Sequence, residues 1–227
     1  MLHIIQNDPE VPPGNIVDNL DVPYVLHHSY STRRMPHPAD VTALIVLGGA
    51  MGANDDETHP FLSPVKTFIK QSVQSGIPYL GICLGGQLLA SALGARVASH
   101  RWNERGIHDV ILNTSGRQDP LFRGFPDRFR TFQWHDDSFD IPQGAKLLAA
   151  SEVCPHQSFR FGARAWGLQF HPEVTEEIIR AWCAAEHVSR ERTEEEVSRF
   201  NSGADSYLGT ARRLLDNFIE AAGIGNT

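Results

Sequence analysis

Cysteine, histidine and glutamate stand in two short segments whose spacing could support nucleophilic chemistry. The first segment, G-I-C-L-G-G-Q at Gly81–Gln87, predicts a strand that ends abruptly in a helix, with Cys83 on the turn between them. Gly81 and Gly85 flank the cysteine, as a tight elbow requires. The N–H groups at the start of the helix favour a thiolate on the elbow. We therefore predict that Cys83 is a nucleophile, rather than a buried structural cysteine, the commonest fate of a free thiol.

The second segment, Q-F-H-P-E at Gln169–Glu173, adds the groups that a thiol nucleophile needs. Proline disfavours helical backbone at the preceding residue, so His171 and Glu173 lie two apart in an extended segment and face the same side. His171 would take the thiol proton, while Glu173 holds the imidazole in orientation. Zinc binding is the alternative for H-x-E, but further ligands at suitable spacing are absent from the sequence and we predict no metal.

A glycine-rich loop, G-G-A-M-G at Gly48–Gly52, follows an apolar run at Val41–Leu47. The loop lacks the G-K-[ST] ending of a phosphate loop. The backbone N–H of Gly49, together with that of Leu84, could converge on the carbonyl oxygen that Cys83 attacks. The plain alternative is a flexible connection after a strand.

The elements around these motifs predict an α/β fold. Apolar, β-branched runs with helical segments between them indicate a parallel sheet with crossover helices, and shorter strands after Ala95 predict a mixed or antiparallel extension. In the first half we expect strands at Leu2–Gln6, Tyr24–His28, Val41–Leu47 and Tyr79–Ile82, and helices at Asn15–Leu20, Phe61–Ser75 and Leu84–Leu93. In the second half we expect strands at Val110–Leu112, Phe129–Gln133, Leu147–Ala150, Ser158–Phe161 and Ala165–Phe170, helices from Thr175 to about His187 and over Leu208–Ala222, and a solvated helix or linker at Arg190–Glu196.

Composition limits the classes of function. The 227 residues are 41% hydrophobic, enough for the core of one large domain. We expect that domain over residues 1–190, with a helical extension over 191–227 packed on it. A formal charge of −7 argues against nucleic-acid and anionic-membrane partners. The first residues do not have the pattern of a signal peptide, and no apolar run approaches the ~20 residues of a membrane span. The three cysteines are not closely paired, as a disulfide framework would require. We therefore expect a cytoplasmic protein.

The motifs G-G-A-M-G, G-I-C-L-G-G-Q and G-L-Q-F-H-P-E, in this order and spacing, resemble the class I (triad-type) glutamine amidotransferase family over roughly Val41 to Glu173. The segments N-D-D-E-T-H-P-F-L and F-Q-W-H-D-D-S-F-D-I-P are similar to stand-alone, GMP-synthase-like members. The resemblance implies a flavodoxin-like fold, with a mostly parallel central sheet flanked by helices and a small antiparallel extension. It also implies a triad of Cys83, His171 and Glu173 that needs no cofactor.

The resemblance extends to the residues around the triad. It implies oxyanion N–H groups from Gly49 and Leu84, and an acidic partner for the substrate ammonium at Asp137. Glu104 matches a family position to which we assign no role. The residues expected to contact the substrate are Gln87, Trp134, His135 and Asp137.

Two residues depart from the family pattern. Ala50 stands where the family often has proline, and Gly86 where it often has alanine, and both changes predict a looser loop and elbow. Complete GMP synthases of the family also carry ATP-pyrophosphatase and dimerisation domains, and no nucleotide-phosphate motif is present here. We therefore expect any ammonia to pass to a separate synthase subunit.

The residues and the resemblance together predict an amide hydrolase that cleaves the γ-glutamyl amide of glutamine through a cysteine thioester. The first alternative is a self-sufficient hydrolase of γ-glutamyl peptides, which needs an opening beside the thiol where a glutaminase needs a closed pocket. A second is a non-catalytic regulatory protein on the same fold. A third is a redox role for the elbow cysteine, which leaves the H-P-E segment without a use.

Overall fold

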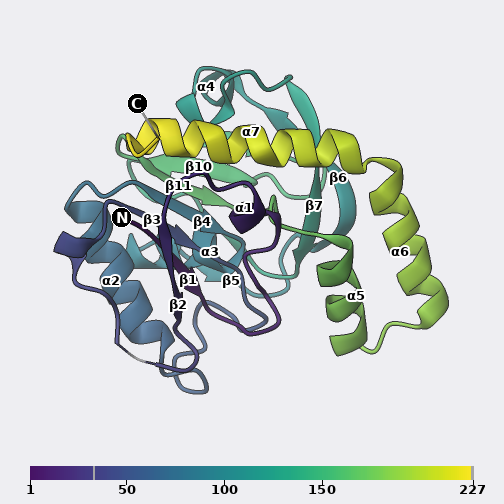
Figure 1. Cartoon of the computed structure of the whole chain (residues 1–227), viewed down its shortest axis with the longest axis horizontal. Coiled ribbons are helices and arrows are strands. Elements are labelled where there is room, and N and C mark those ends of the chain that lie inside the picture. The colour runs from purple at the N-terminus through teal and green to yellow at the C-terminus, as the bar shows by residue number, and fades with distance from the viewer. Residues whose placement is uncertain (33, 226–227) are drawn as a thin grey trace.

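The computed structural model describes residues 1–32 and 34–225, in which a nine-stranded sheet lies between helices (Figure 1). The strand order is β2-β1-β3-β4-β11-β10-β9-β6-β7. Strands from β2 to β11 run parallel, and the pairs from β11/β10 to β6/β7 are antiparallel. A separate ladder pairs β5 with β8. The predicted class is confirmed, with the antiparallel extension continuous with the parallel sheet.

The parallel half is buried on both faces except at its edge strand β2, whose residues are exposed or half-buried. Every residue of β1, β3, β4 and β11 is buried. Side chains on one face pack with α2 and α3, and those on the other face pack with α1 and α7. The strands are β1 (Leu2–Gln6), β2 (Tyr24–His28), β3 (Ala43–Val46), β4 (Tyr79–Ile82) and β11 (Ala165–Leu168), and the helices are α1 (Asn15–Asp18), α2 (Leu62–Gln74), α3 (Leu84–Ala92) and α7 (Ala204–Ala222).

In the antiparallel half, β6 starts at Glu104 and not at the predicted Val110. It pairs with β7 from Glu104 opposite His135 to Ile111 opposite Arg128, and its last residue, Leu112, pairs with β9. Cross-strand contacts therefore extend the strand through residues that carry no apolar alternation. The predicted hairpin of β10 and β11 is confirmed. The remaining strands are β5 (Val97–Ala98), β6 (Glu104–Leu112), β7 (Arg128–His135), β8 (Ser138–Phe139), β9 (Lys146–Ala150) and β10 (Ser158–Phe161), and α4 spans Thr114–Arg117.

Three helices complete the chain, and Figure 1 shows α5 and α6 beside each other at one end of the molecule. The Thr175 hydroxyl accepts a hydrogen bond from the backbone N–H of Ile178 and caps α5 (Glu176–Ala185), so the helix begins where it was predicted. The charged stretch is a full helix, α6 (Arg190–Ser202), and α7 starts at Ala204, before the predicted Leu208. The boundary at residue 190 stays a prediction. Across the described residues, no helix has both the length and the apolar character to cross a membrane.

Candidate active site

Cys83 lies on the elbow between β4 and α3, in a backbone conformation that few residues other than glycine adopt. Its φ is 49° and its ψ is −108°. Such a conformation costs about 1–3 kcal/mol, which the surrounding packing must offset. A Cβ on Gly81 would lie 2.4 Å from the carbonyl oxygen of Gly85, and one on Gly85 would lie 2.0 Å from that of Val46. The close approach of these backbones therefore requires both glycines that flank the cysteine.

Gly86 tightens the elbow, which corrects the expectation that glycine here would loosen it. A Cβ at this position would lie 2.5 Å from the carbonyl oxygen of Leu168 in β11. An alanine would therefore push α3 away from β11, because neighbouring backbone in a packed interior has little freedom to move. With glycine, the helix lies directly on the strand, and the backbone N–H of Cys83 donates to Leu168 O at 2.9 Å.

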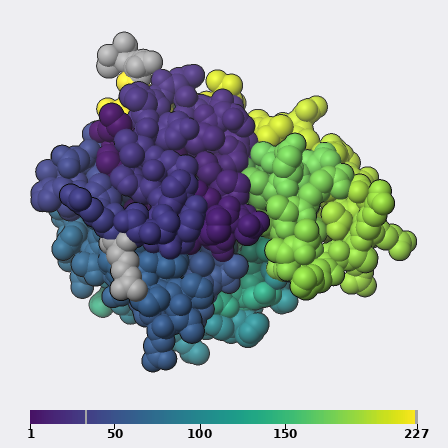
Figure 2. Space-filling model, turned by 60° about the horizontal axis from the view of Figure 1, so that its bottom comes forward, coloured from purple at the N-terminus to yellow at the C-terminus, as the bar shows by residue number. Residues whose placement is uncertain are grey.

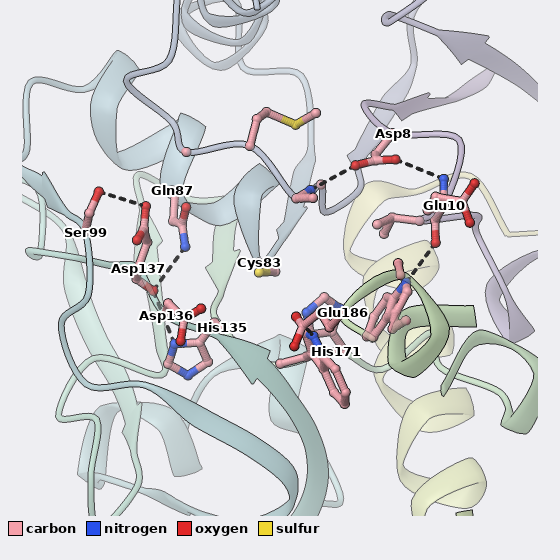
Figure 3. A pocket seen from close by; sticks show the side chains of 18 of the residues that line it. Asp8, Glu10, Cys83, Gln87, Ser99, His135, Asp136, Asp137, His171 and Glu186 are labelled. Atoms are coloured by element: carbon pink, nitrogen blue, oxygen red, sulfur yellow. Dashed lines mark hydrogen bonds between the residues drawn. The ribbon is translucent and has the colours of Figure 1, made fainter. Parts of the chain in front are cut away.

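His171 and Glu173 follow the end of β11 and form a buried pair. Nδ1 of His171 lies 2.6 Å from Oε1 of Glu173. The backbone N–H of His171 donates to Phe132 O in β7 at 2.8 Å, which fixes the extended segment. With Nδ1 directed at Glu173, Nε2 of His171 has no hydrogen-bond partner among the described residues. Figure 3 shows the imidazole and Cys83 in the wall of the same cavity.

Charges around His171 favour its protonated form. Burial lowers the pKa of this imidazole, but the charges of Glu173 and Cys83 outweigh burial and raise the pKa to about 10. Trp182 packs against the ring with centroids 4.9 Å apart and shields it from water. The arrangement can hold an imidazolium–thiolate pair, which provides both a nucleophile and a proton donor.

The two residues expected to stabilise an oxyanion lie against each other beside the thiol. A Cβ on Gly49 would lie 2.8 Å from Cδ2 of Leu84 and 2.6 Å from Sδ of Met51, so a larger residue would displace the ends of these two side chains. Leu84 is the first residue of α3, where backbone N–H groups have no partner within the helix. The structure thus brings Gly49 and Leu84 together, and their role stays a prediction.

Gln87, expected to contact the substrate, uses its side-chain amide inside the protein. Its Nε2 donates to Asp137 O at 3.2 Å and to Oε1 of Gln169 at 3.4 Å. Gln169 in turn donates from Nε2 to Sγ of Cys83 at 3.6 Å. Gln87 also lines the cavity, but these bonds make it a support for Gln169. Sequence reasoning did not single out Gln169, although it stands in the Q-F-H-P-E segment.

Trp134 and Asp137 line the cavity at the end of β7. The indole N–H of Trp134 donates to Oε1 of Glu186 at 2.7 Å. Oδ1 of Asp137 accepts the backbone N–H of His100, and Oδ2 accepts the hydroxyl of Ser99, both at 3.2 Å. Asp137 is therefore held in place by two donors while its carboxylate still faces the cavity, as a partner for an ammonium group requires.

The cavity has a volume of about 400 Å³. It extends from Cys83 and His171 to Trp182 and Glu186, near the end of α5. In Figure 2 the N-terminal segment meets the α5 region at the surface, where the indole N–H of Trp182 donates to Glu10 O at 2.7 Å.

Within residues 1–32 and 34–225, histidine, cysteine and acidic side chains form no group of three able to hold a metal. The carboxylates of the cavity wall belong to Asp8, Glu10, Asp55, Asp136, Asp137 and Glu186.

Comparison with known proteins agrees with this fold. The family model described as Glutamine amidotransferase class-I matches residues 19–181. The chain belongs to this family. A crystal structure of a glutamine amidotransferase from Thermotoga maritima has the same fold, with a TM-score of 0.86 and 30% identity over 96% of this chain and 97% of that one.

Curated relatives of this class I glutamine amidotransferase chain include GMP-synthase subunits. The putative glutamine amidotransferase-like protein YfeJ of Salmonella typhimurium is 31% identical over 175 residues, which cover 75% of this chain and 72% of that protein. One subunit of the glutamine-hydrolyzing GMP synthase of Methanocaldococcus jannaschii is 29% identical over 151 residues, 63% of this chain and 73% of that protein. Longer relatives named GMP synthase are matched over only 19% to 22% of their own length.

His135, also expected to contact the substrate, is held by Glu104, a buried carboxylate to which the sequence assigned no role. Nε2 of His135 lies 3.2 Å from Oε2 of Glu104, and Nδ1 lies 3.2 Å from Asp137 O. Oε1 of Glu104 accepts the hydroxyl of Ser151 at 2.7 Å, and Gln157 donates to Oε2. Both ring nitrogens of His135 are therefore used within the protein, and the ring orients the Asp137 turn.

Tyr207 on α7 supports the triad segment from behind, and sequence reasoning did not find it. Its buried hydroxyl donates to His171 O at 2.9 Å and accepts the backbone N–H of Val174 at 2.8 Å. On the other side, the backbone N–H of Asn15 donates to Glu173 O at 3.0 Å. Only a three-dimensional contact identifies Tyr207, because the tyrosine stands far along the chain in an amphipathic helix.

Proposed function

We propose that this chain hydrolyses the γ-amide of glutamine to glutamate and ammonia. The observation that carries the proposal is the buried pair of His171 and Glu173 beside Cys83, which the elbow holds in a strained conformation in the same cavity. In a member of the class I glutamine amidotransferase family, that arrangement fits a thiolate nucleophile, a proton donor and a carboxylate that orients the donor.

The first half of the reaction forms a thioester. The Cys83 thiolate attacks the γ-carbonyl carbon, and negative charge develops on the carbonyl oxygen, which the N–H groups of Gly49 and Leu84 would stabilise. His171 gives its proton to the amide nitrogen. The C–N bond then breaks, ammonia leaves, and a γ-glutamyl group remains bonded to Sγ.

The second half releases glutamate. A water molecule attacks the thioester carbonyl while His171, now neutral, takes the water proton. The C–S bond breaks, so glutamate leaves and the thiolate of Cys83 is restored beside the imidazolium. The carboxylate of Glu173 stabilises the charge of His171 at the start and at the end of this cycle.

Activity measurements test the proposal directly. Glutamate and ammonia released from glutamine are measured for the wild type, for Cys83→Ala and, as a matched control, for Cys183→Ala, whose thiol is buried away from the cavity among α5 residues. We expect activity in the wild type and in the control, and a loss of at least about 10³-fold in Cys83→Ala. A wild type that neither releases ammonia nor is labelled at Cys83 by a glutamine-like electrophile would favour a non-catalytic regulatory role.

A self-sufficient hydrolase of γ-glutamyl peptides is a second candidate. The observation that favours it is the extent of the cavity, which continues beyond His171 to Trp182, Ala185 and Glu186. An amine larger than ammonia could lie in that part while His171 protonates its nitrogen. Comparing kcat/KM for glutamine and for γ-glutamyl dipeptides separates the two functions. Faster cleavage of dipeptides would assign the extended part of the cavity to the leaving amine.

Under the first function, the released ammonia passes to a separate synthase subunit. Support comes from three relatives that are each named as one subunit of glutamine-hydrolyzing GMP synthase, and so as one part of a larger enzyme. We expect an ammonia-dependent synthase to co-purify with this chain, and we expect that synthase to use glutamine only when the chain is present.

The three cysteines are free and buried, which fits a reducing, cytoplasmic location.

A further inference from the structure

Two side chains that follow β1 hold the glycine loop next to the thiol. Oδ2 of Asp8 accepts the backbone N–H of Ala50 at 2.9 Å, and Oδ1 accepts that of Glu10 at 2.9 Å (Figure 3). The preceding residue, Asn7, donates from Nδ2 to Leu47 O at 2.8 Å. Asp8 is 7% exposed and Asn7 is fully buried. The loop is therefore held both before and after its pair of glycines.

The hydrogen bond from Ala50 to Asp8 fixes the peptide plane between Gly49 and Ala50, which the glycines alone would leave free to turn. Gly49 tolerates many backbone conformations, so the N–H groups of Gly48 and Gly49 can point in several directions. A proline at residue 50 would restrict its own φ and the backbone of Gly49, whereas alanine restricts neither. Alanine does carry a backbone N–H, and the carboxylate of Asp8 accepts it. A charged acceptor makes such a bond about twice as strong as a neutral one.

We propose that Asp8 is a positioning residue for the oxyanion site. It holds the peptide between Gly49 and Ala50, while Asn7 holds Leu47 O before the two glycines. These two bonds limit the backbone conformations open to Gly48 and Gly49, and so keep the N–H of Gly49, in the neighbouring peptide, directed at the space beside Cys83. This inference rests on the proposed function, because it requires a negative carbonyl oxygen to form there. Asp8 acts through the loop. The competing role is direct binding of the substrate ammonium, since the carboxylate also lines the cavity.

Steady-state kinetics separate these roles. Removal of a whole oxyanion donor costs about 10²–10³-fold in kcat, and a donor that is present but poorly oriented should cost about 10- to 100-fold. We therefore expect Asp8→Ala to lower kcat by that smaller factor with KM nearly unchanged. The matched control is Asp18→Ala, an exposed aspartate of α1, which should keep the wild-type kcat. A raised KM with unchanged kcat would assign Asp8 to the substrate ammonium and overturn the proposal.

Two labelling reagents show whether the elbow itself stays intact. Iodoacetamide alkylates Cys83 by direct displacement and forms no oxyanion, whereas a γ-glutamyl chloroketone also presents a carbonyl whose oxygen becomes negative on attack. In Asp8→Ala we expect an unchanged rate with iodoacetamide, and inactivation by the chloroketone slowed by the same factor as kcat. Equal slowing with both reagents would mean that the thiol is disturbed, and would overturn a role confined to the oxyanion site.

A second substitution tests the peptide-plane mechanism. Ala50→Pro removes the N–H that Asp8 accepts and restricts the same backbone through the proline ring. In that background Asp8→Ala should cost much less than in the wild type, and an undiminished cost would contradict the mechanism. A separate result tests the proposed function itself. If the wild type neither hydrolyses glutamine nor reacts with the chloroketone, both the proposed function and the role of Asp8 are refuted. Full activity of Asp8→Ala beside an active wild type refutes only the role of Asp8.

Discussion

At the scale of single residues, the carboxylate of Glu173 sets the protonation state of His171. Its negative charge stabilises the imidazolium, and the pKa of His171 is raised to about 10 against the lowering effect of burial. Loss of a negative neighbour destabilises the charged form, so the proton should leave at lower pH. We predict that Glu173→Gln lowers the pKa of His171 by about 1–3 units.

The pH profile of kcat/KM for glutamine measures that shift. Activity of the wild type should decline at high pH as His171 loses its proton, near its pKa of about 10. In Glu173→Gln the decline should begin at lower pH, because the imidazolium is less stable. Superimposable profiles for the two proteins would exclude Glu173 as the group that holds the proton on His171.

Gln169 is the second residue-scale prediction. Its amide is the hydrogen-bond donor to Sγ of Cys83, at 3.6 Å, and Gln87 holds its oxygen. A hydrogen bond to a charged group contributes about 1.5–3 kcal/mol, so Gln169→Leu should make the thiolate less stable and reduce alkylation at neutral pH by about 10-fold or more. Alkylation should recover as pH rises, because the intrinsic reactivity of the sulfur remains. A variant that is slow at every pH would instead indicate a displaced side chain.

Residue types and spacing were enough to identify Cys83, His171 and Glu173 as candidates, because the chemistry depends on elbow glycines and on an H-P-E segment. The supporting groups could not be found in the same way. Glu104 and Tyr207 act through contacts with residues that are distant in the sequence. No local period or motif reports such a contact, so only the fold reveals them.

At the scale of elements, the packing of α3 on β11 makes Gly86 a sensitive position. A Cβ there would meet the carbonyl oxygen of Leu168 at 2.5 Å, and the obstacle is backbone, which cannot rotate away. Overpacking of this kind costs about 1–3 kcal/mol. We predict that Gly86→Ala lowers the free energy of unfolding by that amount, and that it lowers kcat because the elbow moves with the helix.

Gly209 on α7 provides the matched control for that substitution. A Cβ at this helix position meets nothing within 4 Å. Gly209→Ala should therefore raise the free energy of unfolding by about 0.5–1 kcal/mol, through the better helix propensity of alanine. Urea denaturation of both variants is the measurement. A Gly86→Ala protein as stable as the Gly209→Ala protein would mean that α3 has room to shift.

The strength of apolar patterning decided which elements could be predicted. The strands β3 and β4 are continuous runs without a charged or amide side chain, and β1 has three apolar residues among its five. The predicted positions of all three are right to within a few residues. By contrast, β6 begins in N-E-R-G-I-H-D, where neither face is consistently apolar, and its length comes from pairing with β7. In the same way, α6 buries only Val197 and Phe200, so its helical period is weak.

At the scale of the whole molecule, the last helix belongs to the same core as the site. Leu214, Leu215 and Phe218 of α7 lie in one buried cluster with Leu168 of β11, and Tyr207 of that helix bonds the triad segment. A separate hydrophobic cluster joins α5 and α6 to the cavity wall through Trp182. The expected extension over residues 191–227 should therefore unfold together with the domain over 1–190.

Phe218 tests that cooperativity. Its side chain is fully buried, with its ring centroid 6.1 Å from that of Trp166 in β11. Phe218→Ala should cost about 3–5 kcal/mol, a large share of the about 5–15 kcal/mol that stabilises a typical protein. Leu208→Ala is the control on the same helix, because Leu208 is 41% exposed, and should change stability little. Tryptophan fluorescence and residual activity, followed together through urea denaturation, should give one midpoint that shifts only in Phe218→Ala. If a chain ending at residue 190 stayed folded and active, the last two helices would be a separable extension instead.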